Sequence, residues 1–110
     1  IVPGLKTAIK ALFNKTAQLP EVPMEHPESV LGKNTVQAIQ TGIFYGYTGL
    51  VINMIETLKK EVGEHYKVVA TGGLSSTIEV LNAYFDEVDP DLTLNGLRFI
   101  AHEVTEKQQP

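Results

Sequence analysis

Cysteine is absent from this chain of 110 residues. Without thiols, a disulfide-stapled scaffold and thiolate metal sites are excluded, and the composition fits a cytoplasmic protein. An excess of basic residues is also lacking, because 9 Lys and Arg stand against 13 Asp and Glu, for a net charge of −4. Nucleic-acid-binding proteins usually carry a clustered basic face, so nucleic acid is not an expected partner. With 43% hydrophobic and 20% charged residues, the chain has the composition of a single globular domain.

Charge is also missing from the centre of the sequence, where the 22 residues between Lys33 and Glu56 carry none. A run of this length raises the question of a membrane span. Polar side chains interrupt it too often for a lone span. We therefore expect a helix packed against other protein and no membrane span. The interrupting residues are Asn34, Thr35, Gln37, Gln40, Thr41, Thr48 and Asn53.

The spacing predicts one long helix over this central run. Asn34 is suited to the N-cap, and Gln37 three residues later can reach back in a capping-box arrangement. A helix that is apolar on two sides must be covered on two sides, and Gly42 and Gly46, continued by Gly49, would let another helix approach closely. The first apolar stripe is Val36, Ile39, Ile43, Tyr47, Leu50, Met54 and Leu58, and the second is Phe44, Val51, Ile52 and Ile55.

Two flanking segments are predicted before this helix. Apolar residues at helical spacing predict a first helix from Leu5 to about Leu19. Three prolines between Pro20 and Pro27 predict an extended connector.

The rest of the chain alternates between strand and helix. Residues 67–71 and 87–89 predict short strands, and Ser76 with Glu79 has capping-box spacing at the start of a helix to about Tyr84. A last helix is expected before a polar tail from Thr105. This order predicts an α/β fold with short parallel strands and packed helices. Two strands are few for so much helix, which suggests that part of the sheet is missing.

Two glycine-containing turns are candidate binding sites. Gly72 and Gly73 lie between a strand and a helix, where ligands of α/β proteins gather, although a tight turn also needs glycine without any ligand. Gly32-Lys33-Asn34-Thr35 opens the long helix, whose N–H groups can hold an anion, although Asn34 and Thr35 equally fit a plain helix cap.

A complete catalytic set is not visible. Asp86, Glu87, Asp89 and Asp91 cluster near the second strand, but no further ligands at fixed offsets support a metal cage, and Asp91 fits a helix cap. No Walker-type loop or nucleophile elbow occurs, and we assign no catalytic residue and no metal ligand. Three histidines show no ligand spacing and are expected at the surface: His26, His65 and His102.

In order and spacing, six motifs resemble the C-terminal part of the bacterial type III pantothenate kinases, also described as Bvg-accessory-factor-like proteins. The resemblance covers almost the whole chain. The GKNT element followed by the FYGY helix is its most specific part, whereas TGG is shared by many kinases of the actin-like ATPase superfamily. The motifs are IVPGL at 1–5, LP at 19–20, GKNT at 32–35, GIFYGY at 42–47, ATGG at 70–73 and DPDLTLNGLR at 89–98.

The resemblance implies an actin-like fold of two RNase-H-like domains and a homodimeric kinase that phosphorylates pantothenate with ATP in coenzyme A synthesis. It implies that Thr35 binds pantothenate and that Gly72 and Gly73 lie on the ATP side. The long helix would form the dimer interface. The family also implies magnesium and a monovalent cation, potassium or ammonium, with ligands outside this chain.

The same resemblance implies that residues 1–110 are the C-terminal portion of the second RNase-H-like domain. The family's first phosphate loop, general-base aspartate and Asp-Gly-Thr loop have no counterpart here. We therefore expect a chain that is inactive alone and that pairs with the missing N-terminal half. Two alternatives stay open: a non-catalytic module that oligomerises through the long helix, and part of another actin-like kinase acting on a sugar or acetate.

Overall fold

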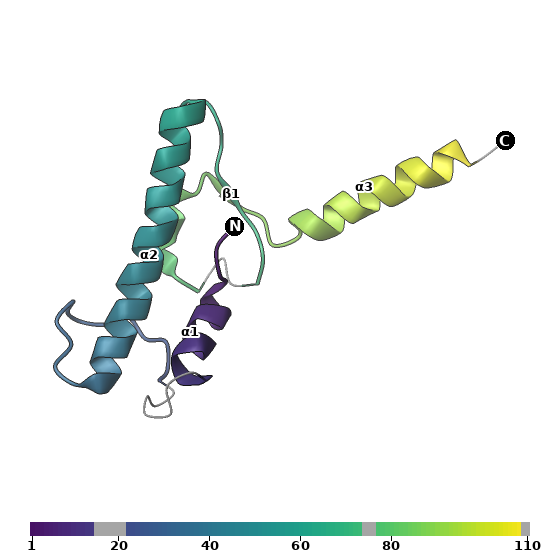
Figure 1. Ribbon diagram of the computed structural model, residues 1–110. Coiled ribbons are helices and arrows are strands. Elements are labelled where there is room, and N and C mark those ends of the chain that lie inside the picture. Colours follow the sequence, from purple (N-terminus) through teal and green to yellow (C-terminus); the bar gives the residue numbers. More distant parts are fainter. Residues whose placement is uncertain (15–21, 74–76, 109–110) are drawn as a thin grey trace. The chain divides into compact units, whose positions relative to one another are not determined.

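The computed structural model describes residues 1–14, 22–73 and 77–108. The chain divides into two compact units, Ile1–Glu61 and Val62–Pro110, which are taken in turn below. The elements in chain order are α1 (Leu5–Asn14), α2 (Thr35–Val62), β1 (Val69–Ala70), the 3₁₀ segment η1 (Glu79–Tyr84), β2 (Glu87–Val88) and α3 (Leu92–Lys107) (Figure 1).

In the first unit, α1 confirms the predicted N-terminal helix. Leu5 is buried at its first turn, and Ala8 N–H donates to the carbonyl of Gly4 at 2.9 Å. The expected continuation to about Leu19 falls in residues 15–21, outside the described part of the chain. Residues 22–27 have no regular secondary structure, as the prolines predict.

The start of α2 confirms the predicted cap, with one difference. Asn34 Oδ1 accepts the backbone N–H of Gln37 at 2.9 Å. Gln37 Oε1 accepts the N–H of Lys33 at 3.0 Å, one residue earlier than a standard capping box requires. At the other end, Gly63 has a φ of +104°, the left-handed conformation that commonly stops a helix and favours glycine.

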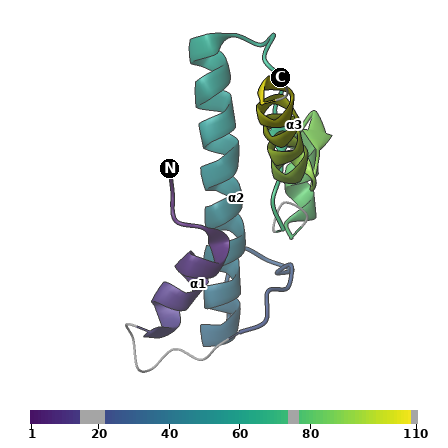
Figure 2. The same ribbon diagram turned by 90° about the vertical axis from the view of Figure 1, so that its right-hand side faces the viewer.

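The core of the first unit lies along the first half of α2. Figure 2 shows α1 beside this half of the helix. The predicted first stripe is covered only in part, because Val36, Met54 and Leu58 are exposed although they belong to it. The buried apolar residues of this unit are Leu5, Val22, Ile39, Ile43 and Phe44.

Polar side chains of α2 hold the connector that precedes it. Gln40 Nε2 donates to the carbonyl of Pro23 at 2.8 Å, and Thr41 Oγ1 donates to the carbonyl of Ser29 at 3.2 Å. Both side chains are buried, so these bonds satisfy polar groups withdrawn from water. The first two turns of α2 therefore fix the path of the connector.

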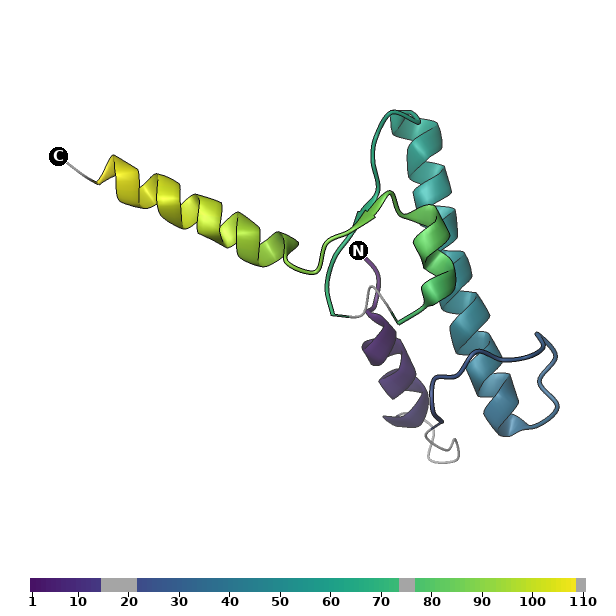
Figure 3. The same ribbon diagram turned by 180° about the vertical axis from the view of Figure 1, so that it is seen from behind.

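The second unit contains the parallel strand pair that the sequence predicts. Val69 pairs with Glu87 and Ala70 with Val88 (Figure 3). The segment before β2 is the 3₁₀ helix η1, where an ordinary helix was expected, and it starts after Ile78 without a side-chain cap. The expected cap residue Ser76 lies outside the described residues.

Helix α3 runs further than the sequence predicts. The expected polar tail from Thr105 is helical to Lys107, since Thr105 Oγ1 donates to the carbonyl of Ala101 and Lys107 Nζ lies 3.4 Å from Glu103 Oε2. All residues of α3 are exposed, including its leucines and Phe99. Among the described residues, no helix has both the length and the hydropathy needed to cross a membrane.

Candidate functional site

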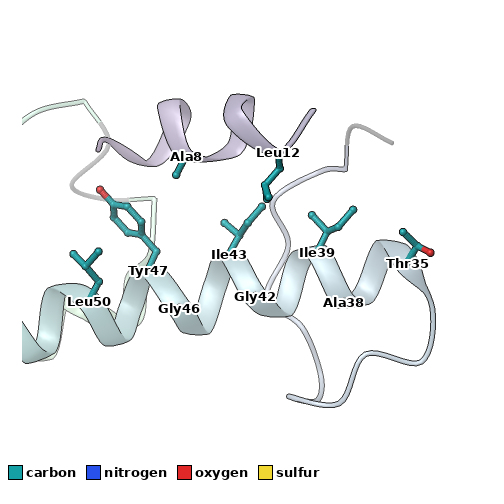
Figure 4. A pocket seen from close by; sticks show the side chains of 10 residues that line it. All are labelled: Ala8, Leu12, Thr35, Ala38, Ile39, Gly42, Ile43, Gly46, Tyr47 and Leu50. Atoms are coloured by element: carbon teal, nitrogen blue, oxygen red, sulfur yellow. The ribbon is translucent and has the colours of Figure 1, made fainter. Parts of the chain in front are cut away.

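Thr35 is the first residue of α2, and its side chain lies at one end of an apolar groove (Figure 4). The groove has a volume of about 660 Å³. Thr35 contributes one of the few polar groups among mostly aliphatic side chains. The lining residues are Ala8, Leu12, Thr35, Ala38, Ile39, Gly42, Ile43, Gly46, Tyr47 and Leu50.

Two helices form this groove. Ala8 and Leu12 of α1 point toward α2, and the side chains of Ile43 and Tyr47 project from α2 toward α1 (Figure 4). Tyr47 also donates its hydroxyl to the carbonyl of Pro3 at 3.3 Å, which ties the residues before α1 to α2. The groove is therefore built by residues of α1 and α2 that are 23 or more positions apart, the shortest separation being that of Leu12 and Thr35.

Glycines keep the α2 side of the groove open. A Cβ placed on Gly42 or Gly46 would meet no atom within 4 Å, and the same holds for Gly49. The close helix approach predicted from these glycines is therefore not made within the described part of the chain. The surface they form is free for a ligand or for another molecule.

The turn before Thr35 is packed tightly against α2. A Cβ on Gly32 would lie 2.6 Å from Ala38 Cα and 2.7 Å from Ala38 N. Contacts this short with backbone atoms cannot be relieved by a side-chain rotation, so the position requires glycine. Gly32, together with the bonds of Asn34 and Gln37, fixes the backbone that presents Thr35.

A second, polar hollow of about 300 Å³ lies on the connector side of the same turn. Lys33, Gln37 and Gln40 reach it from the turn and from α2, and the acidic residues Glu25 and Glu28 reach it from the connector. The hollow is thus lined by charges of both signs. Such a lining favours neither an anionic nor a cationic ligand.

Gly72 and Gly73 follow the carboxyl end of β1, as the sequence predicts. Gly72 has a φ of +100°, and a Cβ on either glycine would meet no atom of the described residues within 4 Å. Because β2 is parallel to β1, Asp89 follows β2 at the same edge, where its N–H donates to the carbonyl of Ala70 at 2.8 Å. The two glycines, which carry no side chains, thus lie at the edge where α/β proteins bind ligands.

Two acidic residues around β2 accept hydrogen bonds from backbone N–H groups. Asp86 Oδ2 accepts the N–H of Val68 at 2.7 Å, and Asp89 Oδ1 accepts the N–H of Asp91 at 3.0 Å. Asp91 occupies the N-cap position of α3, but its side chain makes no cap hydrogen bond, which corrects the predicted role. Within the described ranges, no three carboxylate or histidine side chains come together to hold a metal ion.

The histidines are exposed, as expected. The ring of His26 nevertheless lies edge-on to Phe44, with 4.5 Å between ring centroids. His65 lies beside Tyr66, with 4.3 Å between centroids.

Some residues of the first site were not identified from the sequence. Ala8 and Leu12 carry no signal for it, because their place in the groove depends on how α1 packs. Gln40 and Thr41, which hold the connector and do not line the groove, did carry a signal, since they are adjacent polar residues in an apolar helix. Thr35 belongs to the first unit and the Gly72-Gly73 turn to the second.

Comparison with known proteins links the first of these sites to a family. Residues 1–57, more than half of the chain, match the family described as type III pantothenate kinase. A protein named type III pantothenate kinase from Dehalococcoides mccartyi strain CBDB1 is 46% identical over 100 residues, which cover 91% of this chain and 38% of the relative. Proteins of the same name from Syntrophotalea carbinolica and Citrifermentans bemidjiense are each 48% identical over 100 residues, covering 91% of this chain and 39% of each relative.

The chain thus spans about two fifths of the length of these relatives. The matched residues 1–57 include α1, the Gly32–Thr35 turn and most of α2, which together form the apolar groove. The family match and the groove therefore fall on the same part of the molecule. The chain belongs to the type III pantothenate kinase family.

Proposed function

We propose that this chain is the C-terminal part of a kinase that transfers the γ-phosphoryl group of ATP to pantothenate, forming 4'-phosphopantothenate in coenzyme A synthesis. The observation that carries the proposal is the position of Thr35. It lies in the family-matched region, at the end of an apolar groove and on a turn fixed by three neighbouring contacts. Such a turn presents a hydroxyl in one defined place.

The chemistry of the groove suits pantothenate. This molecule has a dimethyl-substituted carbon between polar groups, namely hydroxyls, an amide and a carboxylate. Aliphatic side chains such as Ile39 and Ile43 can cover the methyl groups, while the Thr35 hydroxyl bonds a polar group. The positive end of the α2 dipole lies beside Thr35 and favours an anionic substrate.

On the nucleotide side, we propose that Gly72 and Gly73 form part of the ATP site. Among the described residues, both glycines leave open space where a side chain would stand, so a flat or bulky group can approach this turn. ATP, when bound, supplies the phosphoryl group. As the family resemblance implies, we propose that the ligands of magnesium and of the monovalent cation lie outside this chain.

We also propose the fold and assembly that the resemblance implies: an actin-like kinase with two RNase-H-like domains, of which residues 1–110 belong to the second, working in the cytoplasm as a homodimer. The parallel β1–β2 pair and the helix-rich character of the chain are compatible with this fold. The exposed Val36, Met54 and Leu58 on α2, together with the open surface at Gly49, which is not among the groove-lining residues, support a dimer interface along this helix.

Helix α3 supports the proposal that further polypeptide completes the fold. Leu94, Leu97 and Val104 share one face, and their exposed fractions are 67%, 58% and 51%. Exposed apolar faces of this kind normally contact other protein. We propose that the part of the kinase that the longer relatives contain, and that this chain lacks, covers this face.

The test is a chimera in which this chain replaces the aligned segment of the Dehalococcoides mccartyi relative. We expect the chimera to phosphorylate pantothenate with ATP and to be inactive on glucose and acetate. The chain alone should be inactive with all three. Activity on glucose or acetate, without activity on pantothenate, would favour the alternative of a different actin-like kinase.

A variant of the nucleotide side sharpens the test. Gly73→Val fills space that is empty in the structure, so the fold should tolerate it. We expect the KM for ATP to rise and the KM for pantothenate to stay constant. An unchanged KM for ATP would remove Gly73 from the nucleotide site.

The second candidate function is a non-catalytic module that only oligomerises through α2. The exposed apolar residues and open glycines of α2 favour it. A chimera that forms dimers of normal mass but has no activity on any of the three substrates would support this candidate over the kinase.

A further inference from the structure

Gln37 joins both sides of the turn that carries Thr35. Its backbone N–H donates to Asn34 Oδ1 at 2.9 Å, and its side-chain Oε1 accepts the N–H of Lys33 at 3.0 Å. In the chain, Thr35 lies between Gln37 and the two residues bonded to it, Lys33 and Asn34. The turn is thus held from the helix side by one residue.

The anchor of this arrangement is rigid. Gln37 belongs to α2, a helix of 28 residues, so its backbone position is set by the helix itself. On the other side of the turn, the contact of Gly32 with Ala38 prevents the chain from moving closer to the helix. The bond from Lys33 to Gln37 prevents it from moving away.

Gln37 holds the turn without entering the groove. The residues that line the apolar groove include Thr35 but not Gln37, whose side chain borders the polar hollow on the connector side. A substrate in the groove would therefore contact Thr35 and would not contact Gln37.

We propose that Gln37 is a positioning residue for pantothenate: its side-chain bond to the Lys33 N–H holds the Thr35 hydroxyl where the substrate needs it. This inference rests on the proposed function of Thr35. Small displacements of a binding group have large effects on affinity and rate. A group that is no longer held in place must also be ordered at each binding event, which costs free energy.

The test uses the chimera with Gln37→Ala, which removes the acceptor for the Lys33 N–H. We expect the KM for pantothenate to rise about tenfold, the loss of roughly one hydrogen bond to a fixed group. The kcat and the KM for ATP should stay within about twofold, because a positioning residue of the pantothenate site does not act on the nucleotide. Gln37→Glu keeps an oxygen acceptor at the same place and should restore the KM for pantothenate.

A purely structural role of Gln37 predicts a different pattern. General loosening of the protein would raise both KM values or lower kcat, and the Glu variant would restore stability without a selective change in one KM. Gln108→Ala, at the exposed end of α3, is the matched control and should change neither KM value. An unchanged KM for pantothenate in Gln37→Ala, or a failure of Gln37→Glu to restore it, overturns the inference.

Thr35→Val separates this inference from the function on which it rests. If Thr35→Val raises the KM for pantothenate and Gln37→Ala does not, the positioning role is wrong and the proposed function stands. If Thr35→Val has no effect, the proposed function of Thr35 fails, and the inference fails with it.

Amide hydrogen exchange covers the case in which the variant chimera does not fold. In the 110-residue chain itself, the Lys33 amide should exchange about tenfold faster in Gln37→Ala, because one hydrogen bond that protects it is lost. It should exchange at the normal rate in Gln37→Glu. An unchanged exchange rate at Lys33 in the alanine variant contradicts the proposal.

Discussion

Thr41 and Thr48 lie on the same helix with the same exposed fraction of 8%, but only Thr41 uses its hydroxyl. Thr41 Oγ1 donates to the carbonyl of Ser29 at 3.2 Å, whereas Thr48 Oγ1 is buried without a hydrogen-bond partner in the part of the chain that the structure describes. Comparing the two residues separates two effects on stability: that of burying a hydroxyl and that of giving the buried hydroxyl a hydrogen-bond partner.

Replacing these two threonines by valine should therefore have opposite effects on stability. Thr41→Val leaves the Ser29 carbonyl without its donor and should lower the free energy of unfolding by about 1 kcal/mol. Thr48→Val removes an unsatisfied hydroxyl at constant shape and should raise it by up to about 1 kcal/mol. Urea unfolding of both variants measures the difference. Equal losses in the two variants would show that Thr48 has a partner in solution.

Gly32→Ala should destabilise the turn before α2. The added Cβ would lie 2.6 Å from backbone atoms of Ala38, so the turn or the helix must shift. Overpacking of this kind lowers the free energy of unfolding by about 1–3 kcal/mol. Gly73→Ala is the matched control, since its Cβ enters open space and its effect should be small. Thermal unfolding of both variants is the measurement, and similar melting temperatures would contradict the tight contact at Gly32.

Gly46→Leu should prevent dimerisation of the chimera without destabilising the helix. In the chain itself the new side chain enters the apolar groove, where an added Cβ would meet no described atom within 4 Å, and leucine is a better helix former than glycine by about 0.8 kcal/mol. In a dimer packed through the glycine surface of α2, the same side chain would clash with the partner. Light scattering should show a fall in mass from dimer to monomer, while the melting temperature of the chain stays constant or rises. A dimer of unchanged mass would exclude Gly46 from the interface.

Asp86→Ala should loosen the parallel strand pair. Asp86 Oδ2 accepts the Val68 N–H at 2.7 Å, just before β1 begins. We expect a loss of about 1 kcal/mol in the stability of the second unit, and faster amide exchange at Val68 than in the parent chain. Asp86→Asn keeps an oxygen acceptor, so its loss of stability should be smaller. Unchanged exchange at Val68 in the alanine variant would mean that this bond does not protect the strand.

Local signals predicted much of the fold. The order of helices and strands, the parallel pair and the cap at Asn34 all depend on nearby residues, and the structure confirms them. The side-chain bond of Gln37 differs from the prediction. A capping box would use the N–H of Asn34, but the turn presents the N–H of Lys33 to Gln37 Oε1. The end of α3 differs because the side chains of Thr105 and Lys107 bond one turn back and continue the helix.

The groove could not be predicted in the same way. The motif predicts Thr35 as a binding residue, which stays a prediction. Ala8 and Leu12 reach the groove only because α1 lies beside α2, and no local pattern specifies that packing. The tight contact of Gly32 with Ala38 is likewise set by the path of the connector. In the sequence, Gln40 and Thr41 are only polar interruptions of an apolar run, because their bonds to the connector depend on the path of residues 22–29.

The most direct test of the central claim is the KM for pantothenate of the chimera carrying Thr35→Val, measured beside Thr35→Ser. Valine keeps the shape of threonine and removes the hydroxyl, so we expect the KM to rise about tenfold or more, while serine restores most of the affinity. The KM for ATP should be the same in both variants. A KM for pantothenate that is equal in the parent chimera and in the valine variant would contradict the account.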